Sequence, residues 1–176
     1  MGGLYSGLVL FAGSTSRRLD QNDQPRLAAF CRSCSDFFEL VEGRAGTGKT
    51  ADKLLNGAPP NVAREKKFVF GFERDVSLVG VVDLIDGFPE SGGWYVGILL
   101  LAPGERSQGM GHALWVSLER WLFGRKADVV RLIVQEQNPR ALRFWRSLGF
   151  ETETKAQLLD LGLTNQTWKL AKRFPT

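Results

Sequence analysis

Apolar residues in this chain fall into short blocks separated by turn residues, and the spacing within the blocks changes along the sequence. Three consecutive blocks rich in Val, Ile, Leu and Phe are typical of strands. They cover 67–72, 78–85 and 95–101, with turns at 73–77 and 86–93. We therefore predict three strands that pair as an antiparallel meander.

The segment before the meander has helical spacing. Asp23-Gln24-Pro25 is typical of a helix start with proline in the first turn. Apolar side chains then recur at helical intervals up to Gly43, namely Leu27, Phe30, Cys31, Cys34, Phe37, Phe38 and Val41. A shorter helix is predicted over 50–55, and an edge strand over 14–19 precedes both helices.

After the meander, a helix over 112–123 and a strand over 128–135 are predicted, so that the last meander strand and the new strand form a parallel pair. Asn138 caps a further helix that ends at Gly149. Segments 150–157 and 166–171 form a closing hairpin. The order β-α-α-β-β-β-α-β-α-β-β predicts an α/β protein with a mixed sheet and helices on both faces, as a single domain over 1–176.

The composition is that of a globular protein, with 43% hydrophobic and 24% charged residues in 176. The net charge of +4 is uneven, because 103–176 hold 12 Lys and Arg against 7 Asp and Glu, whereas 1–102 are nearly neutral. No basic run with interleaved aromatics occurs, so we expect no nucleic acid partner. No apolar run reaches the roughly 18 residues of a membrane span, and one His without clustered Cys predicts no metal site. We expect a cytoplasmic protein.

The segment Trp94 to Gly111 runs from an apolar strand into a Gly-rich turn, and a helix follows at once. The first N–H groups of a helix have no intrahelical partner, and with the positive end of the helix dipole they suit a pyrophosphate. Gly109 and Gly111 permit backbone conformations that a Cβ disfavours, and Arg106 adds a fixed charge. The turn lies in the basic half of the chain, as expected for a polyanionic cofactor.

Two motifs in this region resemble those of a known family. Arg106-x-x-Gly109-x-Gly111 is similar to the acetyl-CoA motif Gln/Arg-x-x-Gly-x-Gly/Ala of the GCN5-related N-acetyltransferase (GNAT) family. Asn138 to Phe150 resembles the family's Asn-x-x-Ala-x-x-Phe-Tyr-x-x-x-Gly-Phe segment, at the right distance and in the right order. The resemblance is sharpest over 94–150. It implies a GNAT-like acyl-CoA N-acyltransferase fold and transfer of an acetyl group to a primary amine of a small molecule or peptide.

The resemblance also implies where acetyl-CoA binds. The strands at 95–101 and 129–134 would splay apart and hold the thioester arm between them. The expected cofactor-binding residues are Leu99, Leu100, Leu101, Arg106, Ser107, Gln108, Gly109, Met110, Gly111, His112, Asn138, Ala141 and Phe144. The expected partners are acetyl-CoA and an amine acceptor, without a membrane and with a homodimer left open.

Direct attack of an amine on a thioester requires a group that takes the amine proton. Asp83 and Glu136 are the candidates by position, with Asp86 and Glu90 behind them, and each is otherwise a surface charge. The acceptor site would be built by the helices over 25–56 and the loop over 86–93, where acidic side chains favour a cationic amine. The expected substrate-binding residues are Asp36, Phe37, Asp86 and Trp94; the alternative of core aromatics and solvated acids stays open.

The leaving thiolate also needs a proton. The family's usual acid is the Tyr of the second motif, but Trp145 occupies that place here, and an indole is no acid at neutral pH. The acid is then Tyr95 or Tyr5, the only tyrosines, or water.

Two other functions remain as alternatives. Segment 43–50 fits the P-loop pattern Gly-x-x-x-x-Gly-Lys-Thr, which would indicate a nucleotide phosphotransferase. A P-loop must follow a buried parallel strand, whereas 36–42 continues a predicted helix, so we interpret 43–50 as an interhelical loop. The non-enzyme alternative is an acyl-CoA-binding regulator without turnover. Cys31-x-x-Cys34 lies inside a predicted helix and indicates two packed thiols rather than a redox pair.

Overall fold

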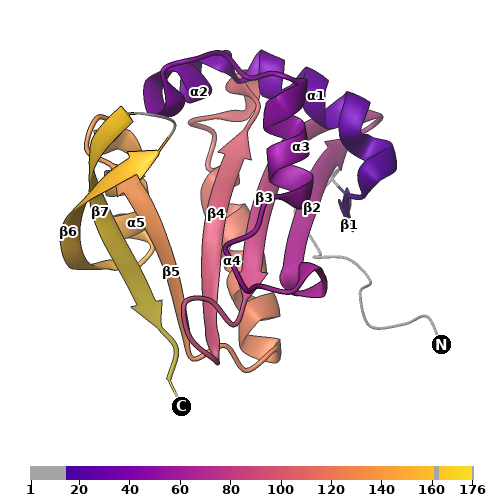
Figure 1. The fold of residues 1–176 in the computed structure, drawn as a ribbon. Helices are drawn as coiled ribbons and strands as arrows, with labels where there is room; N and C mark the ends of the chain where they lie inside the picture. Colours follow the sequence, from indigo (N-terminus) through magenta and orange to yellow (C-terminus); the bar gives the residue numbers. More distant parts are fainter. Residues whose placement is uncertain (1–14, 161–162, 176) are drawn as a thin grey trace.

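One mixed sheet of seven strands organises the computed structural model, which describes residues 15–160 and 163–175. The strand order across the sheet is β1-β2-β3-β4-β5-β7-β6 (Figure 1). The strands are β1 Thr15–Arg18, β2 Lys67–Arg74, β3 Ser77–Asp86, β4 Gly93–Leu101, β5 Val129–Gln135, β6 Glu151–Asp160 and β7 Leu163–Arg173. The predicted meander, parallel pair and closing hairpin are all present.

Helices cover both faces of this sheet (Figure 1). They are α1 Gln24–Ser33, α2 Ser35–Glu42, α3 Gly48–Asn56, α4 Met110–Gly124 and α5 Pro139–Ser147, with short 3-10 helices at Gln21–Asp23, Arg64–Lys66 and Pro103–Glu105. Within the described residues, these helices are too short or too polar to cross a membrane. The predicted α/β class with a mixed sheet is confirmed.

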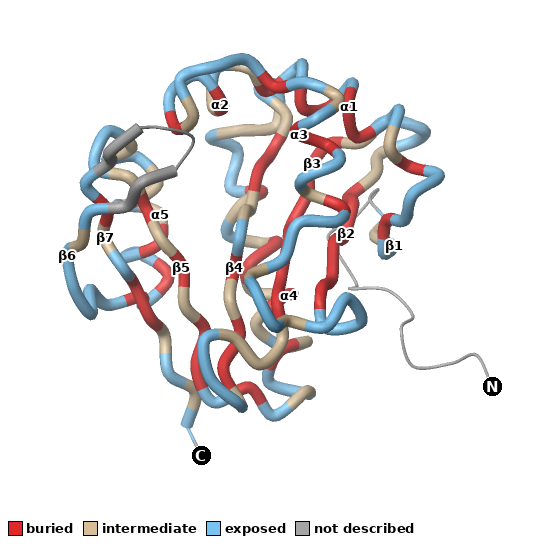
Figure 2. Tube along the Cα trace, viewed as in Figure 1, coloured by how far each residue is buried: buried red, intermediate tan, exposed pale blue. Residues whose placement is uncertain are grey.

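Each face of the sheet has its own hydrophobic cluster, and the buried residues follow the central strands (Figure 2). On one face, residues of β2 to β5 pack against α4 and α5 around the fully buried Trp115. On the other face, Val69, Val81 and Leu100 pack against α1, α2 and α3, including the fully buried Leu27. Alternating side chains of the central strands thus enter both clusters, which is why these strands read as almost continuous apolar runs.

The strands β4 and β5 are paired over only part of their length. Their parallel pairing runs from Gly93 opposite Val129 to Val96 opposite Leu132. At the same level the register between β3 and β4 shifts, so that Gly97 is an extra residue on β4. Beyond Gly97, β4 therefore has no β5 partner, so its N–H groups on that side are open to a ligand, whereas the Leu101 carbonyl accepts from Arg106.

The prediction of a single helix from Pro25 to Gly43 is wrong in one respect. The segment forms two helices, α1 and α2, which meet at Cys34. Cys34 has a non-helical backbone, with φ −102° and ψ 25°. The hydroxyls of the flanking Ser33 and Ser35 donate to the carbonyls of Phe30 and Arg32, and such local side-chain bonds compete with the helical ladder.

The P-loop interpretation of 43–50 fails on its surroundings. The segment follows α2, a helix rather than a buried strand, and α3 begins at Gly48 with Thr47 as its cap. A side chain at Gly46 would collide with the backbone of Cys31, so the loop is packed against α1. Cys31 and Cys34 are buried free thiols, and burial raises the pKa of Cys31 to about 12, which agrees with packed rather than reactive thiols.

Candidate functional site

A cleft of about 530 Å³ opens where β4 and β5 part. Its walls come from α2, the end of β4, the Gly-rich turn before α4 and the first turns of α4 and α5. The lining residues are Asp36, Phe37, Leu40, Leu99, Leu100, Leu101, Arg106, Ser107, Gly109, Gly111, His112, Gln137, Asn138, Pro139, Arg140, Ala141 and Phe144. The volume lies within the usual range for small-molecule and cofactor sites.

The N-terminus of α4 faces this cleft. Gly109 is its N-cap and has a left-handed backbone with φ 79°, a conformation that favours glycine. Ser107 is also left-handed, with φ 65°. The first helical bond of α4 runs from the Ala113 N–H to the Gly109 carbonyl, so the N–H groups before it have no intrahelical acceptor. The turn thus presents backbone donors and a helix dipole to an anion in the cleft.

The side chain of Arg106 is held by contacts with the cleft wall and does not project freely into the cleft. Its Nε donates to the Leu101 carbonyl at 2.9 Å, and its guanidinium is ion-paired with Asp36 of α2. Hydrogen bonding to Arg106 lowers the pKa of the Asp36 carboxyl. The pair joins the end of β4 to α2, so the turn is held in place before a ligand arrives.

Arg140 is a cleft residue that the sequence analysis missed. It lies in the first turn of α5 and donates to the Ser107 hydroxyl across the mouth of the cleft. This contact brings a second guanidinium to the Gly-rich turn. The signal was present, since Arg140 stands between the two matched motif positions Asn138 and Ala141.

The second motif closes the other wall. The Asn138 side chain accepts from the Ala141 N–H at 3.1 Å and thereby caps α5. Phe144, one turn further, lies beside Gly111, where an added Cβ would come within 3.2 Å of its ring. Only a residue without a side chain leaves this space open between α4 and α5.

Two of the predicted cofactor residues are absent from the cleft lining. The side chain of Met110 is buried in the cluster under α4, so only its backbone N–H can serve an anion. The amide of Gln108 is exposed and donates to the Gly104 carbonyl at 2.7 Å. A role for these two residues in cofactor binding therefore stays a prediction, through backbone groups for Met110 and through the turn for Gln108.

Asp83, a predicted base, lies beside the point where β4 and β5 separate. Its carboxylate would come within 2.6 Å of a Cβ at Gly97, the extra residue of β4. Lys67 donates to both carboxylate oxygens at 2.7 Å, and the two side chains are 3% and 10% exposed. Burial raises the pKa of the Asp83 carboxyl and outweighs the opposing effect of the Lys67 ammonium.

Tyr95 lies on the same strand as Gly97, two residues before it. Burial and then the Asp83 charge raise the pKa of its phenol to about 12, so it keeps its proton at neutral pH. Its ring packs edge-on against Phe88. Trp145 occupies the place of the family's Tyr but is buried against Trp115, and its indole fills the core. Tyr5 lies outside the described residues.

The remaining predicted residues are divided between the cleft and other regions. Asp36 and Phe37 line the cleft. Glu136 is half-exposed and ion-paired with Lys155. Asp86 lies opposite Trp94 in the pairing of β3 with β4, at the far end of β4 from the Gly-rich turn, and outside the cleft lining.

Trp94 is a further correction. It is 3% exposed, and its ring contacts Phe68 and Trp121 in the core between the sheet and α4. It cannot form a wall of an acceptor site.

Comparisons with known proteins agree with this geometry. The model of the acetyltransferase (GNAT) family matches residues 36–150, and no curated protein sequence matches the chain. An acetyltransferase from Thermus thermophilus is similar in structure, with a TM-score of 0.70 at 20% identity, over 94% of this chain and 100% of that one. Spermidine N-acetyltransferase from Vibrio cholerae, solved with CoA and spermine, has a TM-score of 0.71 at 16% identity, covering 93% and 96%.

A third similar structure is the ribosomal-protein-alanine N-acetyltransferase from Brucella melitensis, with a TM-score of 0.67 at 19% identity, over 90% of this chain and 99% of that one. These identities show a shared fold, and the family model covers well over half of the chain. The chain therefore belongs to the acetyltransferase (GNAT) family and is an acyl-CoA-dependent N-acyltransferase.

Proposed function

We propose that the acyl donor is acetyl-CoA and that a primary amine of a small molecule or peptide attacks its thioester directly. The observation that carries the proposal is the separation of β4 from β5 after Val96, with the N-terminus of α4 facing the same cleft. The pyrophosphate would bind the N–H groups at Gly109 to Gly111, with the cations of Arg106 and Arg140 nearby. The thioester arm would pass along the unpaired edge of β4.

The unpaired N–H groups of β4 beyond Gly97 are also placed to polarise the thioester carbonyl. Fixed donors directed at a developing oxyanion are among the strongest contributions to catalysis. Holding the two reactants in attack geometry adds up to about 7–11 kcal/mol, so no covalent enzyme intermediate is required. In this proposal, the backbone N–H groups of β4 polarise the carbonyl, and the shape of the cleft positions the two reactants.

For the proton transfers, we assign Asp83 as the acceptor and Tyr95 as the donor. The amine nitrogen bonds to the carbonyl carbon and gives its proton to Asp83, directly or through one water. The C–S bond breaks, and the CoA thiolate takes a proton from Tyr95 or solvent. Asp83 can act despite Lys67, because a carboxylate has more lone pairs than the two donors from one ammonium occupy. Glu136 is the weaker candidate, since Lys155 holds it on the surface.

One domain is proposed for the whole chain, since the strands from Thr15 to Arg173 form a single sheet. A cytoplasmic location and a homodimer stay predictions from the sequence.

The test is release of CoA thiol from acetyl-CoA with a panel of amines. Spermidine and a peptide with an N-terminal alanine are the first acceptors to try, because two of the similar structures are named for these substrates. We expect thiol release that matches acetylated amine by mass spectrometry. Binding of acetyl-CoA without release for any amine would instead identify an acyl-CoA-binding regulator.

A further inference from the structure

A second pocket, of about 330 Å³, lies between the C-terminal end of α3 and the β1–β2 edge of the sheet. It is lined by Arg18, Leu19, Asp20, Gln21, Leu55, Asn56, Arg64, Lys67 and Val69. None of these residues lines the acyl-CoA cleft. Its volume is near the lower end of the range for ligand pockets, so it suits a small occupant.

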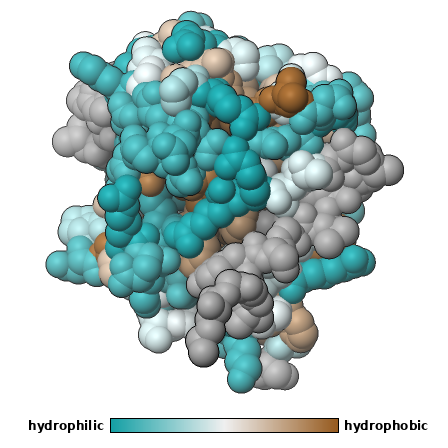
Figure 3. All heavy atoms as spheres, turned by 90° about the vertical axis from the view of Figure 1, so that its right-hand side faces the viewer, coloured by the Kyte–Doolittle hydropathy of each residue, from teal (hydrophilic) through white to brown (hydrophobic). Residues whose placement is uncertain are grey.

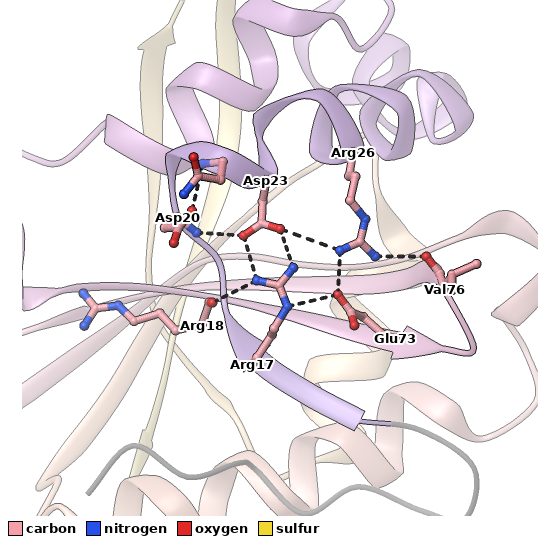
Figure 4. Close-up of polar contacts among 8 residues, drawn as sticks. Arg17, Arg18, Asp20, Asp23, Arg26, Glu73 and Val76 are labelled. Atoms are coloured by element: carbon pink, nitrogen blue, oxygen red, sulfur yellow. Dashed lines mark hydrogen bonds and ion pairs between the residues drawn. The ribbon is translucent and has the colours of Figure 1, made fainter. Parts of the chain in front are cut away.

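Two neighbouring arginines of β1 have opposite surroundings, and one of them belongs to this pocket (Figure 4). Arg17 points into a network with Asp23 and Glu73, where two carboxylates balance it and Arg26. Arg18 points away from that network. It donates to the Lys67 carbonyl and stacks on Phe68 at 4.5 Å, and no carboxylate among the described residues forms an ion pair with it.

Arg64 is the second cation of the pocket without an acidic partner in residues 15–160 and 163–175. Its Nη2 donates to the Asn56 side-chain carbonyl at 2.8 Å. Lys67, by contrast, is neutralised by Asp83. Asp20 is the one acid in the lining, and its carboxylate accepts from the Asn22 N–H. Two guanidinium groups thus meet at one pocket with spare donors, and guanidinium matches a carboxylate or phosphate in geometry.

Part of the pocket wall is hydrocarbon. Leu19, Leu55 and Val69 line it and are 6%, 9% and 4% exposed. On the side of the molecule that faces right in Figure 1, apolar atoms lie in a recess between hydrophilic side chains (Figure 3). A bare inorganic anion would leave this part of the wall in contact with water, whereas an anion with an apolar body would cover it.

We propose that this pocket binds a small organic carboxylate, with its anionic group between Arg18 and Arg64 and its hydrocarbon body on Leu19, Leu55 and Val69. The pocket shares no lining residue with the acyl-CoA cleft, and its link to the proposed acyl-transfer chemistry is Lys67, the partner of Asp83. The inference therefore stands whether or not acetyl-CoA is the acyl donor.

The experiment is a titration of isotope-labelled full-length protein, followed by backbone amide NMR, with three probes: benzoate, its neutral isostere benzamide, and inorganic phosphate. Benzoate should give saturable shifts at the amides of Leu19, Leu55 and Val69. Benzamide and phosphate should each bind at least about tenfold more weakly, since each lacks one of the two complementary parts. Shifts that do not saturate, or equal binding of benzamide, would overturn the proposal.

Variants locate the site. Arg64→Gln, at an exposed position, should weaken benzoate binding several-fold. The double substitution Arg18→Gln and Arg64→Gln should weaken it at least about tenfold. Arg32→Gln removes the same charge from an exposed position on α1 outside the pocket and should leave benzoate binding unchanged. Unchanged thermal unfolding in the single Arg64→Gln variant shows that the fold is intact. Benzoate binding that survives the double substitution contradicts the assignment.

Discussion

In the proposed assignment, the donor side and the acceptor side of the acyl-transfer site are built from very different stretches of chain. The donor side takes its backbone donors, its glycines and the start of α4 from 106–112, with α5 closing the wall. The proposed acceptor side combines α2, the Lys67–Asp83 pair and the extra residue Gly97 of β4. Its link to the donor side, Arg106 with Asp36, joins residues 70 positions apart. A side whose residues are close together in the sequence can be recognised from a motif. A side whose residues are far apart in the sequence cannot.

The largest effect is expected on the acceptor side, from Asp83→Asn. General bases contribute about 10²–10⁴-fold, so kcat should fall at least about 100-fold while acetyl-CoA still binds. Asp86→Asn on the same strand is the matched control and should retain activity, because Asp86 lies opposite Trp94, away from the point where β4 and β5 separate. Steady-state kinetics at saturating acetyl-CoA measure both, and an Asp83→Asn enzyme with more than a tenth of wild-type kcat would remove Asp83 from the mechanism.

The buried pair of Asp83 and Lys67 also predicts how activity depends on pH. Burial raises the pKa of Asp83 above the usual 3.8, and the base acts only when deprotonated. Activity of the wild type should therefore decline as pH falls through that raised pKa, and Asp83→Asn should lack this decline. Identical acid limbs in the two proteins would point to another titrating group.

On the donor side, Gly111→Val should weaken acetyl-CoA binding about 30-fold. The new side chain would occupy the space beside Phe144 in which the cofactor is proposed to lie, and a 30-fold loss of affinity corresponds to about 2 kcal/mol. Gly124→Val at the end of the same helix is the control, because a Cβ there meets nothing within 4 Å. Calorimetric titration gives the affinities; equal values for the two variants would mean that the cofactor does not lie between α4 and α5.

A smaller effect is expected from Arg140→Gln. The loss of one partly exposed cation beside a phosphate should weaken acetyl-CoA binding about fivefold at low salt. The loss of affinity should be smaller at about 0.5 M salt, because salt screens the charges. Arg143→Gln on the same helix, outside the cleft lining, should change little. A loss that is independent of salt would show that Arg140 acts through the Ser107 contact alone.

The smallest effect is expected from Glu136→Gln, with kcat changed less than about twofold. Glu136 is half-exposed and paired with Lys155, so it has little access to the cleft. Should this variant lose activity more than tenfold in the amine assay, the roles of Asp83 and Glu136 would have to be exchanged.

The elements on which the donor side depends could be predicted because each has a local signal. The apolar runs indicated the strands, Asn138-Pro139 marked the start of α5, and the glycines marked the turn before α4. The break at Cys34 was missed because the apolar spacing continues through it while the serine hydroxyls interrupt the helix.

On the acceptor side, the structure places Asp36 and Phe37 in the cleft lining but buries Trp94, because tertiary packing decides which side chains are exposed. Trp94 stands at the start of a strand, and only the fold shows that its face of the sheet lies under α4. The burial of Lys67 against Asp83 joins two strands across the sheet, and neither residue carries a pattern that reveals its partner. Arg140 could have been found, since it lies inside a motif that was already matched.

The measurement that tests the central claim most directly is thermal unfolding with acetyl-CoA and, separately, with ATP–Mg²⁺. At about 100 times its dissociation constant, a ligand adds roughly 2.7 kcal/mol to stability. Acetyl-CoA should stabilise the wild type and have much less effect on Gly111→Val, and ATP–Mg²⁺ should stabilise neither. Stabilisation by ATP–Mg²⁺ alone, abolished by Lys49→Ala, would contradict the account and transfer the phosphate site to 43–50.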